Sequence, residues 1–385
     1  MALGAAATLD ELEAPEAHAL YARLREREPV SWVPALGGWL VTRRDLALQV
    51  MNDAETFTVD DPRFSTGQVV GPSMLTLDGD EHRRHRTPFA RPFRLDAVRE
   101  RFTALVADEV ERLIDAVEPA GEVELRRSFA GPLAAAIVTY ALGLRDTDTE
   151  AVLRWYDDIV AAVTEVTGGG PVPDAGRAAF ADLRMAIEPV LDREPGSSLL
   201  AAAAGDAGGL RRDEVVSNAA VMLFGGIETT EGMIANAVAH LLANPEQRAL
   251  AEADPATLAN AIEESLRLEP AAAMVDRYAT ADVALGGARI ARGDLVHVSV
   301  TAASRDPATF ADPDRFDVRR ANANQHLAFA RGPHVCIGMH LARLEAHTAV
   351  GRLLARLPGL RLDPDHPSAA RGLVFRKPPA LRVLW

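Results

Sequence analysis

The sequence is short of cysteine and of positive charge, and each shortage excludes a class of protein. A single cysteine, Cys336, cannot form an internal disulfide, so the fold does not depend on an oxidising compartment. The formal net charge is −14, which argues against nucleic acid as a partner because phosphate binding requires a basic face. Lys377 is the only lysine, so nearly all the positive charge is arginine.

The chain also lacks the patterns of a membrane span and of a secretory signal. Its longest apolar run, near Ala130–Leu144, is interrupted by Pro132 and is shorter than the roughly 18–20 residues that a membrane span requires. The first residues have no basic stretch ahead of an apolar one, so they do not resemble a signal peptide. We therefore expect a cytoplasmic protein that does not enter a membrane.

What is present is mainly helical periodicity, with a few alternating segments. Helices are predicted where apolar residues recur at helical spacing, over 16–28, 97–118, 211–252 and 340–357. Strands are predicted around Gly-Gly turns or alternation, over 29–43, 279–300 and 372–385. Two irregular segments, Val59–Ser73 and Thr167–Asp174, are candidate mobile loops or lids. We predict one domain over residues 1–385, mainly α with small β-sheets.

The single cysteine lies in an unusual loop, FARGPHVCIG, residues 329–338. Cys336 directly precedes a predicted helix, where free backbone N–H groups and the helix dipole favour a thiolate. Gly332 and Gly338 allow tight turns and close backbone approach, and Pro333 stiffens the bend. A lone cysteine is most often a small buried hydrophobe, but this loop indicates a thiolate that is presented to a large ligand.

Three further patterns are ambiguous by themselves. The stretch GGIETT, Gly225–Thr230, places two glycines inside a long helix, at a cost of about 1–2 kcal/mol relative to alanine. Either a close helix crossing or a local opening of the helix explains that cost. Glu264 and Arg267 are neighbours on a helix, as are His82 and Arg86, and such pairs are usually solvated.

Taken together, these patterns resemble the cytochrome P450 family. The motif F-x-x-G-x-H-x-C-x-G carries most of the resemblance, and it is met by Phe329, Gly332, His334, Cys336 and Gly338. The other patterns follow in the family's order across residues 82–345, so the resemblance covers essentially the whole chain. It implies the P450 fold, with a long central helix that crosses over haem b (iron protoporphyrin IX). It also implies that the thiolate of the cysteine is the axial ligand of the haem iron.

The resemblance assigns further residues to the haem and to oxygen chemistry. Glu228 and Thr229 are expected to deliver protons during oxygen activation, beside a local opening of the helix at Gly225. Buried haem propionates require charge-assisted hydrogen-bond donors. The expected cofactor-binding residues are His82, Arg86, Gly225, Arg277, Phe329, Gly332, His334, Cys336 and Gly338.

It also implies a buried support for the cysteine loop. Glu264 and Arg267 match the family's E-x-x-R element, and Arg319 is the candidate third member, with Arg320 as the alternative. The chain departs from the family pattern in small ways, and one of them is Lys377, which stands where a glycine is frequent.

The implied activity is a monooxygenase that inserts one oxygen atom from O2 into a mid-sized, largely apolar substrate, in natural-product tailoring. The expected electron donor is a separate ferredoxin or flavodoxin with an NAD(P)H-linked reductase. The predicted docking patch consists of Arg83, Arg84, Arg91, Arg94 and Arg343. The predicted substrate pocket consists of Val69, Val70, Met74, Val221, Phe224, Ala273, Met274, Val275 and Val374.

Other functions are compatible with the same loop. The haem site could run ring coupling, desaturation or peroxide-driven oxidation, and the product mass under labelled dioxygen distinguishes these from oxygen insertion. A non-enzymatic haem-binding sensor or carrier is a further alternative. A cysteine hydrolase is disfavoured, because no base with an orienting carboxylate is positioned near Cys336.

Overall fold

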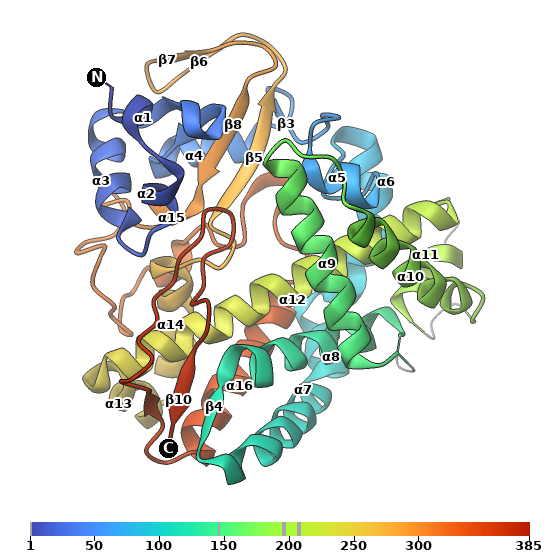
Figure 1. Cartoon of the computed structure of the whole chain (residues 1–385), viewed down its shortest axis with the longest axis vertical. Coiled ribbons are helices and arrows are strands. Elements are labelled where there is room, and N and C mark those ends of the chain that lie inside the picture. Colours follow the sequence, from blue (N-terminus) through green and yellow to red (C-terminus); the bar gives the residue numbers. More distant parts are fainter. Residues whose placement is uncertain (1, 145–146, 195–197, 206–208) are drawn as a thin grey trace.

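The computed structural model describes residues 2–144, 147–194, 198–205 and 209–385, and it is mainly helical, as the sequence predicted (Figure 1). The α-helices are α1 (Leu3–Ala6), α2 (Leu9–Glu13), α3 (Ala17–Arg27), α4 (Arg44–Asn52), α5 (Ser65–Val70), α6 (Gly79–Ala90), α7 (Leu95–Val117), α8 (Gly131–Leu142), α9 (Thr149–Thr167), α10 (Asp174–Leu191), α11 (Leu199–Gly205), α12 (Arg212–Ala243), α13 (Pro245–Ala253), α14 (Pro255–Leu268), α15 (Val300–Ala303) and α16 (Met339–Arg356). Short turns that bear on the site are η2 (Arg91–Phe93), η4 (Arg126–Ala130) and η6 (Gly332–His334).

The strands form three small sheets. They are β1 (Val30–Val33), β2 (Gly38–Val41), β3 (Phe57–Thr58), β4 (Glu122–Glu124), β5 (Met274–Ala279), β6 (Val283–Leu285), β7 (Ala288–Ile290), β8 (Leu295–Ser299), β9 (Arg361–Leu362) and β10 (Arg382–Leu384). The largest sheet has the order β1-β2-β8-β5-β3, in which β2 and β8 are parallel and the other pairs antiparallel. The others are β4-β10-β9 and the β6-β7 hairpin.

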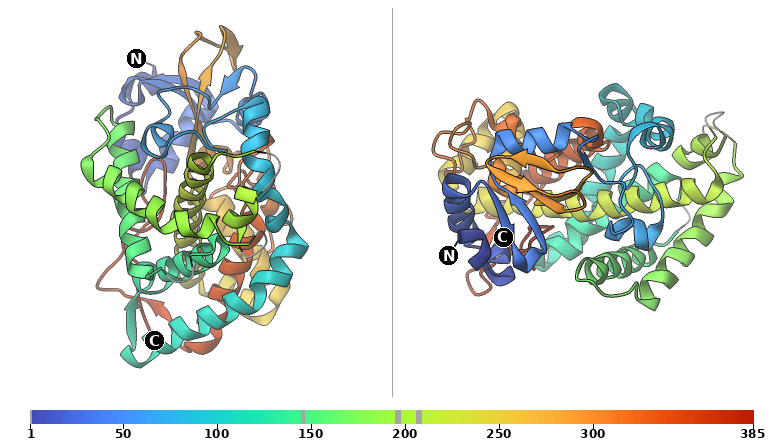
Figure 2. Two further views of the ribbon diagram at one scale, coloured as in Figure 1. Left: turned by 90° about the vertical axis from the view of Figure 1, so that its right-hand side faces the viewer. Right: turned by 90° about the horizontal axis from the view of Figure 1, so that it is seen from above.

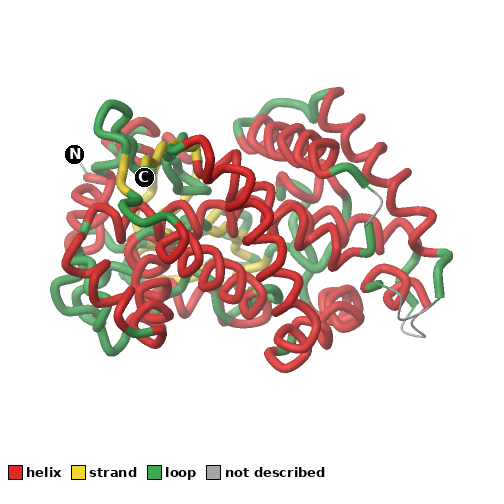
Figure 3. Tube along the Cα trace, turned by 90° about the horizontal axis from the view of Figure 1, so that it is seen from below, coloured by secondary structure: helices red, strands yellow, loops and turns green. Residues whose placement is uncertain are grey.

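The strands gather in one half of the molecule, and helices make up the other half (Figure 3). The five-stranded sheet and α1–α3 lie at one end, and α7 and α16 lie toward the other, with α12 running between them (Figures 1 and 2). None of the helices in the described part of the chain is long and apolar enough to cross a membrane.

Most of the predicted elements are present, and one prediction is wrong. Both hairpins with Gly-Gly turns form, as β1-β2 and β6-β7. The segment 168–173 is irregular, as expected, and joins α9 to α10. Val59–Ser73, however, contains α5, whose Ser65 Oγ receives a hydrogen bond from Thr167 Oγ1 at 2.9 Å. Packing of this short helix against α9 overrides its breaker-rich composition. That the chain is one domain over 1–385 stays a prediction.

The two adjacent glycines of the central helix α12 have different surroundings. A Cβ at Gly226 would come within 3.2 Å of Val138 Cγ2 on α8, so this glycine permits a close helix crossing. A Cβ at Gly225 would meet no atom within 4 Å among the described residues, so this position faces open space. The two explanations that the sequence left open therefore each apply, to one glycine apiece.

Candidate active site

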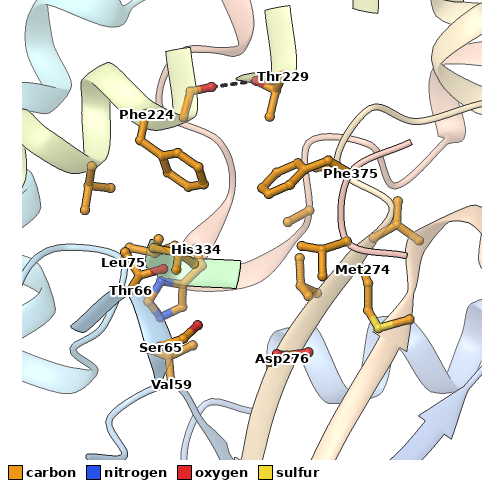
Figure 4. Close-up of a pocket in the computed structure, with 18 of the residues that line it drawn as sticks. Val59, Ser65, Thr66, Leu75, Phe224, Thr229, Met274, Asp276, His334 and Phe375 are labelled. Atoms are coloured by element: carbon orange, nitrogen blue, oxygen red, sulfur yellow. Dashed lines mark hydrogen bonds between the residues drawn. The ribbon is translucent and has the colours of Figure 1, made fainter. Parts of the chain in front are cut away.

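A cavity of about 1400 Å³ lies between α12, the cysteine loop and the large sheet. Cys336 lines one wall, and Gly225 and Thr229 line another. Phe224 and Phe375 approach each other edge to face, with ring centroids 5.6 Å apart (Figure 4). The wall is thus mostly apolar at one end and holds a thiol at the other, which is the general form of a small-molecule site.

Hydrogen bonds to its backbone hold the cysteine loop in shape. The N–H of Cys336 donates to the carbonyl of Phe329 at 2.9 Å, and Arg86 Nη2 donates to the carbonyl of Val335 at 2.6 Å. Ala330 has a positive φ of 55°, which is uncommon for a residue with a side chain and marks a tight bend. Cys336 lies just before Gly338, the N-cap of α16, so the thiol stands near the start of this helix, as the sequence predicted.

Gly332 is expected to bind the cofactor, and this stays a prediction. It does not line the cavity. Its φ is +72°, and a Cβ there would lie 2.3 Å from the carbonyl oxygen of Met51 on α4. Glycine is required here because the loop packs directly against another segment of backbone. Gly338, in contrast, does line the cavity.

The electrostatics of Cys336 favour the thiol unless a cation binds. Burial raises the pKa of the thiol, and the N–H of Gly338 and the charges of Arg86 and Arg343 offset this only in part. A thiolate here therefore needs a positive partner at the sulfur. A coordinated metal ion is such a partner, and the thiol loses its proton when the metal binds.

Cationic and imidazole side chains gather at the polar end of the cavity. Arg86, Arg277 and His334 line it, and His334 Nε2 lies 2.8 Å from Asp78 Oδ1. His82 does not line the cavity, but its ring packs on that of His334, with centroids 4.4 Å apart. Burial, together with His334 and Arg86, lowers the pKa of His82 to about 4, so this ring is neutral at pH 7.

These features fit a flat cofactor that carries carboxylates. His82 Nε2 is buried and has no hydrogen-bond partner among the described residues, so this nitrogen can form a hydrogen bond to a bound group. The guanidinium groups of Arg86 and Arg277 are the donors that buried carboxylates require. Open space in front of Gly225 and Gly338 leaves room for a planar ring, since a Cβ at either glycine would meet nothing within 4 Å in the described chain.

The two residues expected to deliver protons differ in their surroundings. Thr229 lines the cavity, and its Oγ1 donates to the carbonyl of Gly225 at 2.6 Å (Figure 4). Glu228 does not line the cavity. Its Oε1 lies 2.7 Å from Lys377 Nζ, in an ion pair that the sequence gave no reason to expect.

The E-x-x-R element forms a fully buried network. Arg267 Nε and Nη2 donate to the two oxygens of Glu264, at 2.7 and 2.9 Å, and both side chains are 0% exposed. The third member is Arg320, whose Nε lies 3.0 Å from both Glu264 oxygens. The choice of Arg319 was wrong, since its side chain is exposed. The turn at Asp317, whose N–H donates to Glu264 Oε1, directs the later arginine inward.

A second link joins α14 to the cysteine loop, and the sequence analysis missed it. Glu263 accepts hydrogen bonds from Arg343 Nε at 2.6 Å and lies 3.2 Å from His326 Nε2. The guanidinium of Arg343 also stacks on the ring of Phe329, 4.5 Å from its centroid. Burial opposes ionisation, but the bonds from Arg343 and His326 lower the pKa of Glu263 to about 2. The adjacency of Glu263 to the E-x-x-R glutamate was the only available signal.

Part of the predicted substrate pocket lines the cavity. The predicted residues that line it are Met74, Val221, Phe224, Met274, Val275 and Val374. Val69 and Val70 do not, because α5 turns Ser65 and Thr66 to the cavity and packs its valines into the core. Ala273 is buried against the C-terminal segment instead, with its N–H donating to the carbonyl of Val374 at 2.8 Å.

The predicted basic docking patch is largely neutralised. Arg84 Nη2 lies 2.7 Å from both Glu81 Oε2 and Glu214 Oε1, and Arg83 pairs with Asp80. Arg343 is likewise engaged by the glutamate on α14. The remaining members, Arg91 and Arg94, are exposed at η2, which packs against α16.

Comparisons with known proteins agree with this geometry. A family model described as Cytochrome P450 matches residues 256–381. Cytochrome P450 107B1 of Saccharopolyspora erythraea is 35% identical over 385 residues, covering 92% of each chain. Cytochrome P450 monooxygenase PikC of Streptomyces venezuelae is 35% identical over 368 residues, covering 91% of this chain and 86% of its own.

A solved structure shows the same fold. It is described as a post-tailoring hydroxylase, HmtN, involved in himastatin biosynthesis. It superposes with a TM-score of 0.84 at 29% identity, and covers 98% of this chain and 99% of its own. The agreement extends over the helices and sheets that enclose the cavity. The chain therefore belongs to the cytochrome P450 family, as an oxygen-inserting oxidoreductase that depends on haem and acts on a small molecule with O2.

Proposed function

We propose that the cofactor is haem b and that the thiolate of Cys336 would hold its iron. The observation that carries this is the position of the chain's only cysteine, at the cavity wall and at the start of α16. Arg86, Arg277 and His334 would hold the propionates, with His82 completing that end. When bound, the haem supplies activation of dioxygen, and thiolate ligation favours cleavage of the O–O bond.

The remaining steps belong to side chains of this chain. Thr229 presents a hydroxyl to the cavity and can pass a proton from the interior of α12 to the reacting oxygen. Glu228, the preceding residue, is buried against Lys377 and supplies that proton. Phe224 and Phe375 orient the substrate and exclude water from the reacting end.

The substrate is a mid-sized, largely apolar natural product. The size of the cavity and the apolar side chains of Val221, Phe224, Met274 and Val374 support this class. The similarity to a post-tailoring hydroxylase points to the same kind of pathway step. Addition of candidate terpenoids, aromatics and polyketides to the holoenzyme, followed through the spin-state shift of the Soret band, identifies the compound that binds.

Electrons come from a separate ferredoxin or flavodoxin with an NAD(P)H-linked reductase, in the cytoplasm. Arg91 and Arg94 are the positive groups left for an acidic carrier on the face that η2 and α16 share. Changing Arg94→Glu should slow reduction of the haem and weaken its dependence on salt. An unchanged reduction rate would contradict this docking face.

The decisive experiment on the ligand is the carbon monoxide difference spectrum of the reduced protein. We expect the strongly red-shifted Soret band that thiolate ligation gives. Cys336→Ser should lose that band while Gly332→Ala, away from the cavity, keeps it in whatever fraction folds. A wild-type spectrum without the shift would contradict the assignment of Cys336.

A further inference from the structure

The sole lysine of the chain is placed against the proton-delivery helix. Lys377 Nζ lies 2.7 Å from Glu228 Oε1 and 3.6 Å from Glu231 Oε1, and its side chain is 12% exposed. The two glutamates are three residues apart on α12, so they share one face of the helix. Lys377 therefore lies between two acids, one of which directly precedes Thr229.

The backbone around Lys377 is fixed to the same helix. Arg376 N–H donates to the carbonyl of Ala271 at 3.0 Å, and Asn236 Nδ2 on α12 donates to the carbonyl of Arg376 at 3.0 Å. Arg376 is itself fully buried in an ion pair with Glu269 at 2.8 Å. The ammonium group of Lys377 is therefore positioned by a segment whose backbone is anchored to the rest of the fold.

Gly232 lies against both Ala271 and the lysine stem. A Cβ at this position would come 3.4 Å from Lys377 Cδ and 2.9 Å from Ala271 Cβ. Because Gly232 is four residues after Glu228, it lies on the same face of α12. Its missing side chain is required by Ala271, and the lysine stem passes beside it at ordinary contact distance. The helix and the C-terminal segment therefore fit each other at this contact.

A second cation completes the cluster. Arg126 Nε on η4 lies 2.7 Å from Glu231 Oε1, and Arg126 Nη1 donates to the carbonyl of Pro378 at 3.2 Å. Glu231 is fully buried, yet neither of its oxygens accepts a hydrogen bond within the described chain. Two acids and two bases thus balance in charge but are incompletely bonded, which leaves acceptor positions free for a proton or a water.

We propose that Lys377 is a positioning residue for proton delivery, which holds the Glu228 carboxylate outside the cavity, next to the cavity-lining Thr229. The inference rests on the proposed function of Glu228 and Thr229. A buried carboxylate without a partner is costly, so removal of the ammonium should make Glu228 turn to another donor. The groups that face Glu228 are Lys377 from the C-terminal segment and Glu231 from its own helix, with Arg126 behind them.

The first test needs no turnover. In isotope-edited infrared spectra of the holoenzyme, the carboxylate band of Glu228 is the one that Glu228→Gln removes. We expect Lys377→Met to shift this band and Lys377→Arg to leave it close to its wild-type position. Arg127→Met is the matched control, because Arg127 is an exposed neighbouring cation that pairs with Asp157 at 3.1 Å. A band that does not move in Lys377→Met would overturn the proposal.

The second test uses a substrate that the binding screen identifies. Lys377→Met should lower kcat about tenfold, raise the solvent isotope effect on kcat, and leave substrate affinity within about twofold. It should also lower the product formed per NAD(P)H, and Lys377→Arg should restore most of both losses. An unchanged isotope effect and unchanged coupling in Lys377→Met would make the pair merely structural and overturn the proposal.

The two levels of inference fail separately. If Glu228→Gln leaves the isotope effect unchanged, the proposed role of Glu228 falls and that of Lys377 falls with it. If Glu228→Gln raises the isotope effect but Lys377→Met does not, only the role of Lys377 is overturned.

Discussion

Two buried clusters of acids and bases can be compared within this chain. Each is built on glutamate in a helix: Glu264 with Arg267 and Arg320 at α14, and Glu228 and Glu231 with their cations at α12. In the α14 cluster, Arg267 also donates to the carbonyls of Pro313 and Ser304, so donors and acceptors are matched. In the α12 cluster, the buried oxygens of Glu231 lack hydrogen bonds within the described residues.

The difference separates structural support from chemistry. A buried network in which every member is satisfied fixes one conformation, because any change leaves a polar group unpaired. A network with free acceptor positions can accept a proton or rearrange without that penalty. The α14 cluster fixes the turns that lead to the cysteine loop, and the α12 cluster lies beside the residue that faces the reacting end of the cavity.

The largest effect should come from breaking the satisfied cluster. Arg267→Met leaves Glu264 as a buried charge with one partner fewer, and we expect a loss of about 3–5 kcal/mol in the free energy of unfolding. Urea unfolding of the holoenzyme measures it. Arg319→Met is the matched control, and because its side chain is exposed it should change stability by less than about 0.5 kcal/mol. Equal losses in the two variants would contradict the assignment of the network.

The next effect should come from the second link of α14, and it depends on pH. The pKa of Glu263 is lowered from 4.5 to about 2, so its ionised form stabilises the fold above pH 4.5. We expect Glu263→Gln to cost about 3 kcal/mol at pH 7. The difference from wild type should disappear as the pH falls from 4.5 to 2, because both forms are then uncharged. Glu246→Gln, at an exposed position of α13, is the matched control variant.

The smallest effect should have the opposite sign with pH. Burial raises the pKa of Glu231 above 4.5, and Lys377, Arg126 and Arg127 offset this only in part. Its contribution to stability is therefore full below pH 4.5 and is lost as the pH rises through the raised value. We expect Glu231→Gln to change the free energy of unfolding by less than about 1 kcal/mol, with wild type losing ground to the variant as the pH rises above 4.5. A stability that instead falls as the pH drops below 4.5, as expected for Glu263, would contradict the raised pKa of Glu231.

Residues that are neighbours along one helix or one loop could be predicted from the sequence. Glu264 and Arg267, and the order of glycines around Cys336, depend on local spacing that a helix or turn fixes. No feature of the sequence distinguishes Arg320 from Arg319, because an irregular segment has no periodicity that indicates which of two adjacent arginines points inward. Val69 and Val70 were expected in the pocket but pack into the core. Apolar character indicates that a side chain is buried, but not which surface it packs on.

The sequence alone indicated the class of chemistry, because the motif around Cys336 resembles the haem-binding signature of the cytochrome P450 family. It also determined the long helix and its glycine pair, because these follow from periodicity and from the side chain that glycine lacks. Only the tertiary structure decided that Lys377 meets Glu228, and that Gly332 supports α4 while Gly225 opens the cavity. The physical reason is that ion pairs and close backbone contacts join segments more than a hundred residues apart, and no local spacing encodes where those segments meet.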